Sequence, residues 1–152
     1  SEDLDVNADD ILVLKQIGPK GAPGMPEAGY MPIPKKLARA GVKDMVRISD
    51  GRMSGTAFGT IVLHITPESA IGGPLAYVEE GDQIQLSVKN RQISLLISED
   101  ELAKRIQARP ISPPTAERGY HKLFLDTVTQ ADQGVDFDFL RHPEHKGKTP
   151  TG

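Results

Sequence analysis

The amino-acid sequence predicts one α+β domain that is mainly β, or a barrel-like domain, with short helices around its strands. Three observations lead to this prediction. The chain has 152 residues, which is enough for one domain with its own core. It contains 15 glycines and 12 prolines, and a helical bundle could not use so many residues that interrupt helices. Its apolar residues fall in short runs between glycine- and proline-rich loops.

The first 40 residues predict a strand, a long loop and a short helix. The apolar run over 10–17 predicts the strand. The loop over 18–34 carries four glycines and five prolines, so we expect a stiff segment that presents a binding surface. The helix over 34–40 has proline in its first turn, and Gly41 follows as its C-terminal stop.

Two further strands flank a second glycine-rich loop. Residues 45–49 predict the first strand, residues 50–59 the loop, and residues 60–65 the second strand. The second strand has so few polar residues that we expect it to be buried on both faces. His64 is then expected to be a core imidazole with hydrogen-bond partners rather than a ligand.

The second half of the chain predicts a hairpin followed by two helices. Alternating polar and apolar residues indicate the hairpin. Thr66 before Pro67 is typical of a helix N-cap, and Ser98 with Glu101 three residues later is typical of a capping box. The expected elements are one turn through Ile71, hairpin strands over 83–88 and 92–97, a helix from Ser98 through Ile106, and a short helix over 119–131.

Composition excludes several classes of function. The net charge of −3 gives no reason to expect nucleic acid as a partner. No apolar run approaches membrane-spanning length and no signal-peptide pattern opens the chain, so we expect a cytoplasmic protein without a membrane partner. Because the chain has no cysteine, it forms no disulfide and offers no thiolate to zinc or an iron–sulfur cluster.

The two glycine-rich loops carry the candidate chemistry. Ser54 and Thr56 lie in the loop over 50–59, and Glu27 ends the richest part of the loop over 18–34. A serine becomes a base or nucleophile only beside a metal, oriented amides or a proton acceptor. The simpler alternative is a turn serine that bonds its own backbone. Ser54 does not fit a hydrolase elbow, because Arg52 stands where that motif requires glycine.

Other polar residues have weaker claims to function. Glu27 is either a magnesium ligand or a solvated carboxylate. Asp50 and Arg52 either orient the site or form an ordinary ion pair, and we favour structural roles. His142 and His145 are spaced like zinc ligands but lie on a polar tail without a second pair. Lys20, Lys35 and Lys36 border the first loop and are suited to an anionic substrate.

Four segments together resemble the C-terminal domain of the dihydroxyacid and sugar-acid dehydratases. They occur in the order of that family and cover about residues 5–140. The segments are IGPKGAPGMPE, DMVRISDGRMSGTAFGT, HITPESAIGGPLAYVEEGDQI and ERGYHKLFLDTVTQADQGVDFDFL.

The resemblance implies a fold, a reaction and site residues. The implied fold is a barrel-like swivelling β/β/α domain. The implied reaction removes water from a 2,3-dihydroxy acid to give a 2-keto-3-deoxy acid. Ser54 corresponds to the base that takes the C2 proton, Glu27 to a Mg²⁺ ligand, and Thr56, with Gly55, to substrate-binding residues. Mg²⁺ would stabilise the enediolate, an iron–sulfur cluster would take the C3 hydroxyl, and we expect His142 to reach the substrate of a neighbouring site.

Within the family, R-M-S-G-T-A-F-G resembles the pentonate dehydratases of arabinonate or xylonate type, and Thr56 is the residue that marks this subgroup. The ending G-V-D-F-D-F-L also fits the sugar-acid branch. Two alternatives remain open: a dihydroxyacid dehydratase of branched-chain amino acid synthesis, and a binding or assembly module that kept only the fold.

The chain lacks parts that the resemblance requires. Cluster ligands, for which we expect a 2Fe-2S type, and the other Mg²⁺ ligands belong to a larger preceding domain. We therefore expect residues 1–109 to be a C-terminal catalytic domain without its first strands. Residues 110–152 are expected to be an extension that packs on the N-terminal domain or on another subunit of a homo-oligomer. The isolated chain is expected to be inactive.

Overall fold

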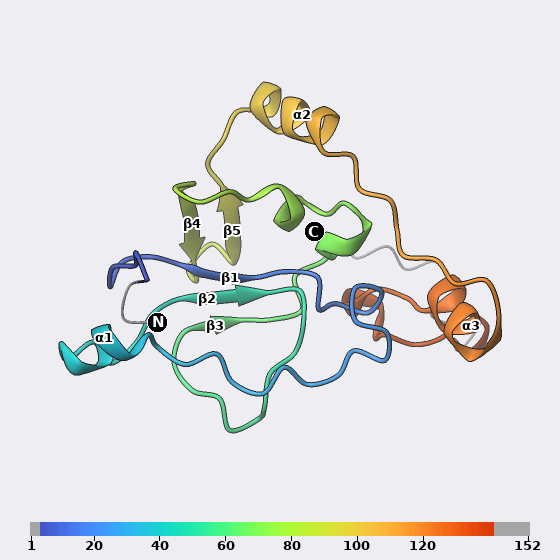
Figure 1. Ribbon diagram of the computed structural model, residues 1–152, viewed down its shortest axis with the longest axis horizontal. Coiled ribbons are helices and arrows are strands. Elements are labelled where there is room, and N and C mark those ends of the chain that lie inside the picture. Colours follow the sequence, from blue (N-terminus) through green and yellow to red (C-terminus); the bar gives the residue numbers. More distant parts are fainter. Residues whose placement is uncertain (1–3, 142–152) are drawn as a thin grey trace.

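Three short parallel strands run through the middle of the molecule (Figure 1). The computed structural model describes residues 4–141. The strands are β1 (Leu12–Leu14), β2 (Arg47–Ser49) and β3 (Ile61–Val62), in the order β1-β2-β3. All three residues of the central strand β2 are buried. The carboxyl ends of β1 and β2 therefore lie side by side, and both glycine-rich loops start at this edge of the sheet.

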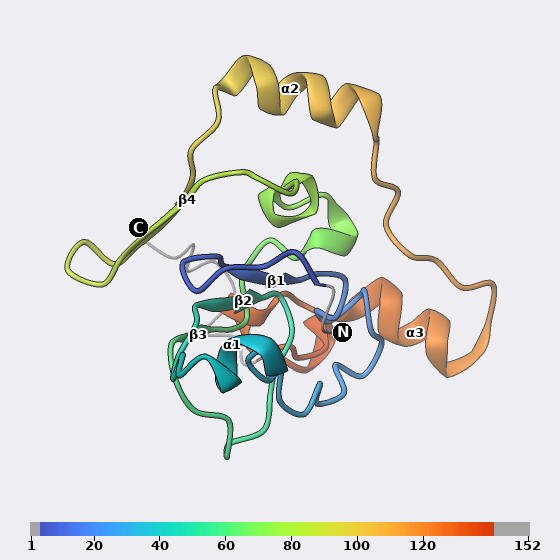
Figure 2. The same cartoon turned by 60° about the vertical axis from the view of Figure 1, so that its left-hand side comes forward.

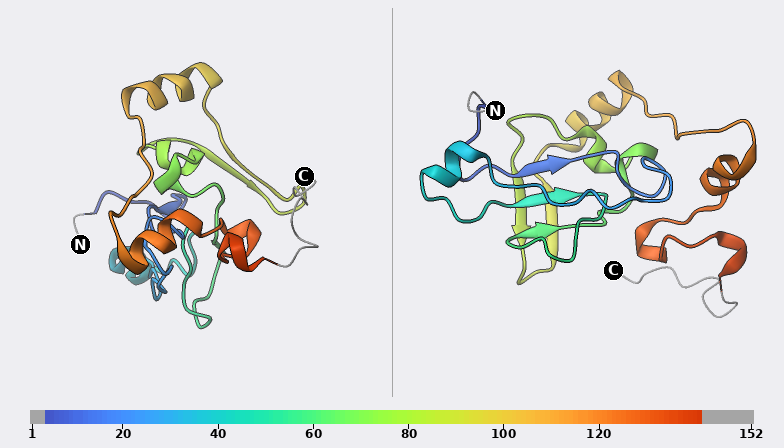
Figure 3. Two further views of the ribbon diagram at one scale, coloured as in Figure 1. Left: turned by 90° about the vertical axis from the view of Figure 1, so that its right-hand side faces the viewer. Right: turned by 60° about the horizontal axis from the view of Figure 1, so that its bottom comes forward.

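A two-stranded antiparallel hairpin crosses the parallel strands on one side (Figure 3, right). The hairpin consists of β4 (Ile84–Ser87) and β5 (Gln92–Leu95). Three α-helices lie around the two sheets: α1 (Lys35–Arg39), α2 (Glu99–Ala108) and α3 (Gly119–Thr127). In the described part of the chain, no helix is long and apolar enough to cross a membrane. Single 3₁₀ turns cover Ser69–Ile71, Pro74–Tyr77, Ala131–Gln133 and Asp138–Leu140.

One hydrophobic core joins the parallel sheet to the hairpin. Ile48 from β2, Leu75 from the 3₁₀ turn Pro74–Tyr77 and Val78 are buried at the centre of this core. Burying side chains of this size stabilises the fold by roughly 1.5–3 kcal/mol each. Partly buried side chains from β1, β3, β4 and β5 complete it: Ile11, Val13, Val46, Val62, Ile65, Ile84 and Leu95.

Most of the predicted elements occur where the sequence placed them, although the strands are shorter. The strands predicted over 10–17 and 45–49, the hairpin and the helices near 34–40 and 98–106 are confirmed. The helix predicted over 119–131 ends at Thr127, and a 3₁₀ turn follows. The closed, swivelling barrel stays a prediction for the complete domain.

The expectation for residues 60–65 is wrong in two respects. Strand β3 covers only two residues, both half-buried, because it has a strand neighbour on one side only among residues 4–141. His64 is exposed rather than part of the core. Its backbone adopts the left-handed conformation, with φ of 58°, which turns the chain out of the strand.

The two predicted helix caps have different outcomes. Ser98 accepts a hydrogen bond from the Glu101 N–H at 3.1 Å and so caps α2 as expected. The Glu101 carboxylate accepts a bond from Arg105 Nε at 3.0 Å. Thr66 caps no helix, because its hydroxyl donates to the His64 carbonyl at 3.0 Å and the 3₁₀ turn begins at Ser69.

Residues 110–141 build a second, smaller hydrophobic cluster around α3. A long connection leads from α2 to this part of the chain (Figure 2). Phe124, Leu125 and Val128 are buried, and the Phe124 and Phe137 rings meet edge to face at 5.8 Å. Gln130 links the cluster to the rest of the molecule, since its amide Nε2 donates to Glu68 Oε1 at 2.7 Å.

The attachment of α2 is expected to weaken in acid. Arg105 binds the largely buried Asp82 carboxylate through two nitrogens, at 2.6 and 3.0 Å. These hydrogen bonds hold the pKa of Asp82 below its usual 3.8. A depressed carboxyl pKa stabilises the folded state above about pH 4, and the stabilisation is lost as the pH falls through the lower, folded pKa. The protection factors of the α2 amides against hydrogen exchange are therefore expected to fall below pH 4.

The Asp82→Asn variant tests this prediction. In it, the protection factors of the α2 amides should already be low at neutral pH and should change little in acid. Asp100→Asn, an exposed acid in the first turn of α2, serves as the control. Equal acid sensitivity in the wild type and Asp82→Asn would contradict the assignment.

Candidate functional site

The two glycine-rich loops lie against each other and are joined by three hydrogen bonds. The Ala28 N–H donates to the Arg52 carbonyl at 3.0 Å, and the Ser54 N–H donates to the Gly29 carbonyl at 2.7 Å. The Arg52 side chain adds a third bond, from Nε to the Met25 carbonyl at 2.8 Å. The fold therefore brings the Glu27 loop and the Ser54 loop together, as the sequence predicts.

The Ser54 hydroxyl lies in a tight turn with Thr56. Ser54 Oγ is 2.9 Å from Thr56 Oγ1, and the Thr56 N–H approaches Ser54 Oγ at 3.3 Å. The Ala57 N–H closes the turn on the Ser54 carbonyl at 2.9 Å. Ser54 is half-buried, whereas Gly55 and Thr56 are exposed, and a methyl group added to Gly55 would meet no atom within 4 Å.

This geometry agrees with the simpler alternative, a serine that bonds its own turn. It also allows the Ser54 hydroxyl to be reactive. The Thr56 hydroxyl and amide are two donors that can bond Ser54 Oγ. Donors directed at an oxygen stabilise negative charge on it and lower the free energy needed to remove its proton. The open space at Gly55 leaves room for a ligand beside the hydroxyl.

Asp50 fixes the start of both loops from inside the protein. Its side chain is fully buried and bonds backbone amides at the end of β1: Oδ1 accepts from the Ile17 N–H at 3.1 Å and Oδ2 from the Gln16 N–H at 3.2 Å. Oδ2 also accepts from the amide and hydroxyl of Ser69, at 2.8 and 2.5 Å. Asp50 is therefore structural and bonds these groups rather than Arg52.

Glycine is required where the backbone passes over these groups. A methyl group at Gly51 would lie 2.4 Å from Ile17 Cδ1, and one at Gly18 would lie 2.6 Å from Glu68 Oε2. Neither position has room for a side chain. The glycines of the two loops thus serve close packing of backbone against side chain.

Glu68 is a buried carboxylate that the sequence interpretation missed. It accepts bonds from the Lys20 N–H at 2.9 Å, from the Gly21 N–H at 2.8 Å and from Gln130. These amides of the first loop are therefore bonded within the protein. The N–H groups of a glycine-rich loop form a site that favours a negatively charged group. This preference is the sequence signal that could have pointed to a buried acid elsewhere in the chain.

Arg47 is the second residue that the sequence interpretation missed. It comes from β2, is fully buried and reaches both loops. Its NH1 donates to the Tyr30 hydroxyl and the Met31 carbonyl at 3.0 and 3.1 Å, and its NH2 donates to the Phe58 carbonyl at 2.9 Å. NH2 also pairs with Asp44 at 2.9 Å. The arginine therefore holds the far ends of the two loops together.

Glu27 suits a shared metal site rather than a complete one. Its side chain is exposed at the loop junction. Among residues 4–141, no three histidine or acidic side chains gather to hold a metal ion. Mg²⁺ prefers six oxygen ligands, and Glu27 alone can supply only one or two of them. An iron–sulfur cluster does not fit this chain, because the chain has no cysteine. His142 and His145 lie outside the described residues.

The sequence of the chain matches one protein family over most of its length. The family described as the dihydroxy-acid/6-phosphogluconate dehydratase C-terminal domain matches residues 1–135. The chain belongs to this family, and the resemblance found in its motifs is confirmed.

Several curated relatives resemble the chain closely. A protein named as a dehydratase, from Rhizobium meliloti (strain 1021), is 59% identical over 138 residues, which is 91% of this chain. A 6-deoxy-6-sulfo-D-gluconate dehydratase of Pseudomonas putida is 50% identical over 97% of the chain, and an L-arabonate dehydratase of Azospirillum brasilense 51% over 91%. The chain spans about a quarter of the length of these relatives, 24% of the first and 25% of the other two.

The relatives named as sugar-acid dehydratases are more similar to the chain than a relative named as a dihydroxy-acid dehydratase. A dihydroxy-acid dehydratase of Streptococcus sanguinis (strain SK36) is 39% identical over 91% of the chain. The difference of about ten percentage points from the sugar-acid relatives is in the direction that the R-M-S-G-T-A-F-G segment predicts.

Proposed function

We propose that this chain is the C-terminal portion of a hydro-lyase that converts a sugar acid into a 2-keto-3-deoxy acid. The observation that carries the proposal is the Ser54 hydroxyl, paired with Thr56 on a loop that is bonded to the Glu27 loop. Family membership and the names of the relatives support the reaction class.

In this proposal Ser54 is the base. The C2 proton passes to Ser54 Oγ, the electron pair of the C2–H bond forms the C2–C3 double bond, and the C3 hydroxyl departs as water after protonation. The enol then gives the 2-keto acid. The Thr56 hydroxyl and amide hold negative charge on Ser54 Oγ before it accepts the proton. Thr56, with Gly55 beside it, also contacts the substrate.

Two cofactors complete the proposal and depend on the rest of the protein. Glu27 would be one ligand of Mg²⁺, which would supply Lewis-acid stabilisation of the negative charge that develops when the C2 proton leaves. An iron–sulfur cluster, for which we propose the 2Fe-2S type, would need cysteines from outside this chain. We further propose a cytoplasmic homo-oligomer in which residues 110–152 pack on the N-terminal domain or a second subunit.

A substrate panel tests the function in the full-length protein. We expect kcat/KM for aldonates, pentonates above all, to exceed that for 2,3-dihydroxyisovalerate by about 100-fold or more. A site that hydrogen-bonds the additional hydroxyls of a sugar acid discriminates strongly against a substrate that lacks them. The measurement is keto-acid formation at several concentrations of each substrate.

The outcomes separate the alternatives. Preference for 2,3-dihydroxyisovalerate would instead assign the protein to branched-chain amino acid synthesis. Absence of turnover on every substrate, in protein with a full complement of cofactors, would favour a non-catalytic module.

A further inference from the structure

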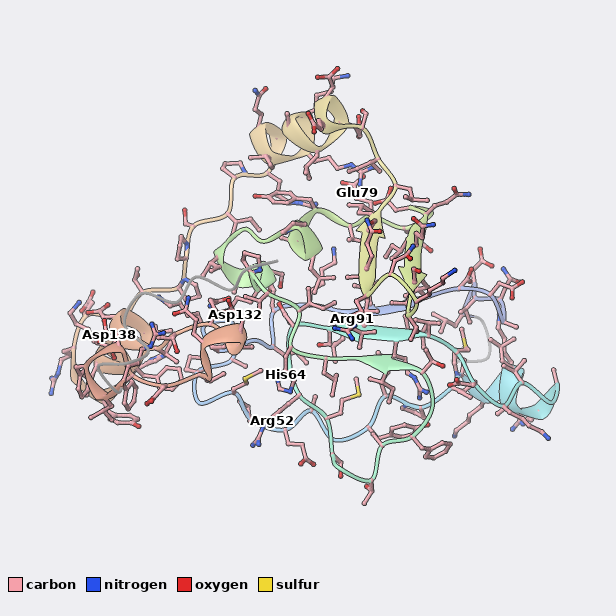
Figure 4. The ribbon with its side chains drawn as sticks, turned by 180° about the vertical axis from the view of Figure 1, so that it is seen from behind. Arg52, His64, Glu79, Arg91, Asp132 and Asp138 are labelled. Carbon is pink, nitrogen blue, oxygen red and sulfur yellow. The ribbon has the colours of Figure 1, made fainter. Side chains whose placement is uncertain are left out.

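Two exposed basic side chains, Arg52 and His64, lie beside the Ser54 loop. Figure 4 shows them close together where the Ser54 loop and the turn after β3 meet. The His64 N–H donates to the carbonyl of Gly51, the residue before Arg52, at 3.1 Å. The two side chains therefore belong to one place in the fold although they come from different segments.

Arg52 is held by one edge of its guanidinium group. Nε donates to the Met25 carbonyl at 2.8 Å, and the Arg52 carbonyl accepts from the Ala28 N–H at 3.0 Å. Both bonds tie it to the Glu27 loop. Arg52 is in none of the ion pairs that the structure shows within residues 4–141. Its terminal nitrogens remain a fork of donors of the kind that binds a carboxylate through both oxygens.

His64 is exposed, and its left-handed backbone conformation is energetically unfavourable. A left-handed conformation costs a residue with a side chain roughly 1–2 kcal/mol, and glycine would adopt it without that cost. Here it is held by the bond to Gly51, by the Thr66 hydroxyl on the His64 carbonyl at 3.0 Å and by the Ile65 N–H on the Ser49 carbonyl at 3.1 Å. The result is an exposed imidazole next to Arg52.

We propose that Arg52 and His64 form the subsite that binds the carboxylate of the substrate, an inference that rests on the proposed function. The Arg52 fork takes both carboxylate oxygens, and a His64 ring N–H donates to one of them. C2 of a sugar acid is bonded directly to the carboxylate carbon. A carboxylate held at Arg52, two residues from Ser54, therefore brings the C2 proton to the Ser54 loop. Arg52 and His64 thus determine specificity for an acid over a neutral sugar.

The test uses the full-length protein and two ligands that cannot lose water. One is a 3-deoxy aldonate, which lacks the leaving hydroxyl, and the other is its uncharged amide. In Arg52→Met, the Kd of the acid measured by calorimetry should rise about 10- to 100-fold, as expected for a hydrogen bond to a charged group. The Kd of the amide should change less than about twofold. His64→Ala removes one donor and should weaken acid binding about 3- to 10-fold by the same argument.

Two further variants separate binding from folding. Arg52→Lys keeps the charge but not the fork, so acid binding should fall between those of the wild type and Arg52→Met. Arg91→Met, an exposed arginine in the turn between β4 and β5, should leave the binding of both ligands unaffected. A merely structural role of Arg52 would weaken both ligands together and leave the acid-to-amide ratio unchanged.

Different experimental results would overturn the carboxylate subsite and the proposed function. An acid-to-amide ratio in Arg52→Met within twofold of the wild type would overturn the inference even if the wild type dehydrates sugar acids. A wild type that binds the acid no better than the amide would also overturn it. A wild type that prefers the acid through Arg52 but turns over no aldonate would overturn the proposed reaction instead.

Discussion

Replacing Ser54 with alanine in the full-length protein is expected to lower kcat by a factor of about 10²–10⁴, which is the range for loss of a catalytic base. KM should change little, because the proton acceptor acts in the transition state rather than in binding. The wild-type enzyme should also exchange the C2 hydrogen of a 3-deoxy aldonate with D₂O, and Ser54→Ala should not. Proton NMR of the ligand measures this exchange.

The control is Ser112→Ala, the same chemical change on the connection between α2 and α3. It should leave kcat, KM and exchange as in the wild type. Thr56→Val should lower kcat by about tenfold, roughly the effect of one lost hydrogen bond to Ser54. Turnover by Ser54→Ala within tenfold of the wild type would remove Ser54 from the role of base.

The meeting of the two loops was predictable from sequence because both are local features. Each follows an apolar strand, and glycine and proline mark the loop residues wherever they fall. Parallel neighbouring strands then bring the loops that follow them to one edge of a sheet. Ser54, Thr56 and Glu27 could be selected in this way, because each stands in or at the end of a glycine-rich segment.

The buried polar residues could not be selected from the same pattern. Arg47 and Glu68 are charged, and charged residues are seldom fully buried unless hydrogen-bond partners compensate them. Apart from Asp44, three residues before Arg47, these partners are distant in the sequence. They lie 11–17 residues from Arg47 at Tyr30, Met31 and Phe58, and 47–62 residues from Glu68 at Lys20, Gly21 and Gln130. Only the folded chain brings such groups together.

His64 is the opposite case, because it was predicted to be buried and is exposed. Four apolar neighbours in T-I-V-L-H-I predicted a buried strand, and periodicity contains no term for the backbone conformation of a single residue. The bond from its N–H to Gly51 decides the outcome, because it turns the chain out of β3 toward the Ser54 loop. A residue that composition placed in the core thus becomes a candidate for substrate binding.

Replacing Asp50 with asparagine is expected to have the largest effect on stability, lowering the free energy of unfolding by about 2–4 kcal/mol. Asparagine has the same shape but offers one acceptor oxygen, and its NH₂ group would face an N–H donor of Gln16, Ile17 or Ser69. A hydrogen bond to a charged group contributes roughly 1.5–3 kcal/mol, and a buried donor without an acceptor adds a further cost. For a domain of this size the melting temperature should fall by about 5–15 °C.

The matched control for Asp50→Asn is Asp138→Asn, which changes an exposed carboxylate (Figure 4) and should alter stability by less than about 0.5 kcal/mol. Urea denaturation of the chain, followed by far-UV circular dichroism, measures both variants. Because Asp50 bonds the end of β1 and precedes the Ser54 loop, native-state hydrogen exchange should report faster opening of both glycine-rich loops in Asp50→Asn, with α2 unaffected. If Asp50→Asn matched Asp138→Asn in stability and in loop exchange, the buried carboxylate would not be what holds the two loops in register.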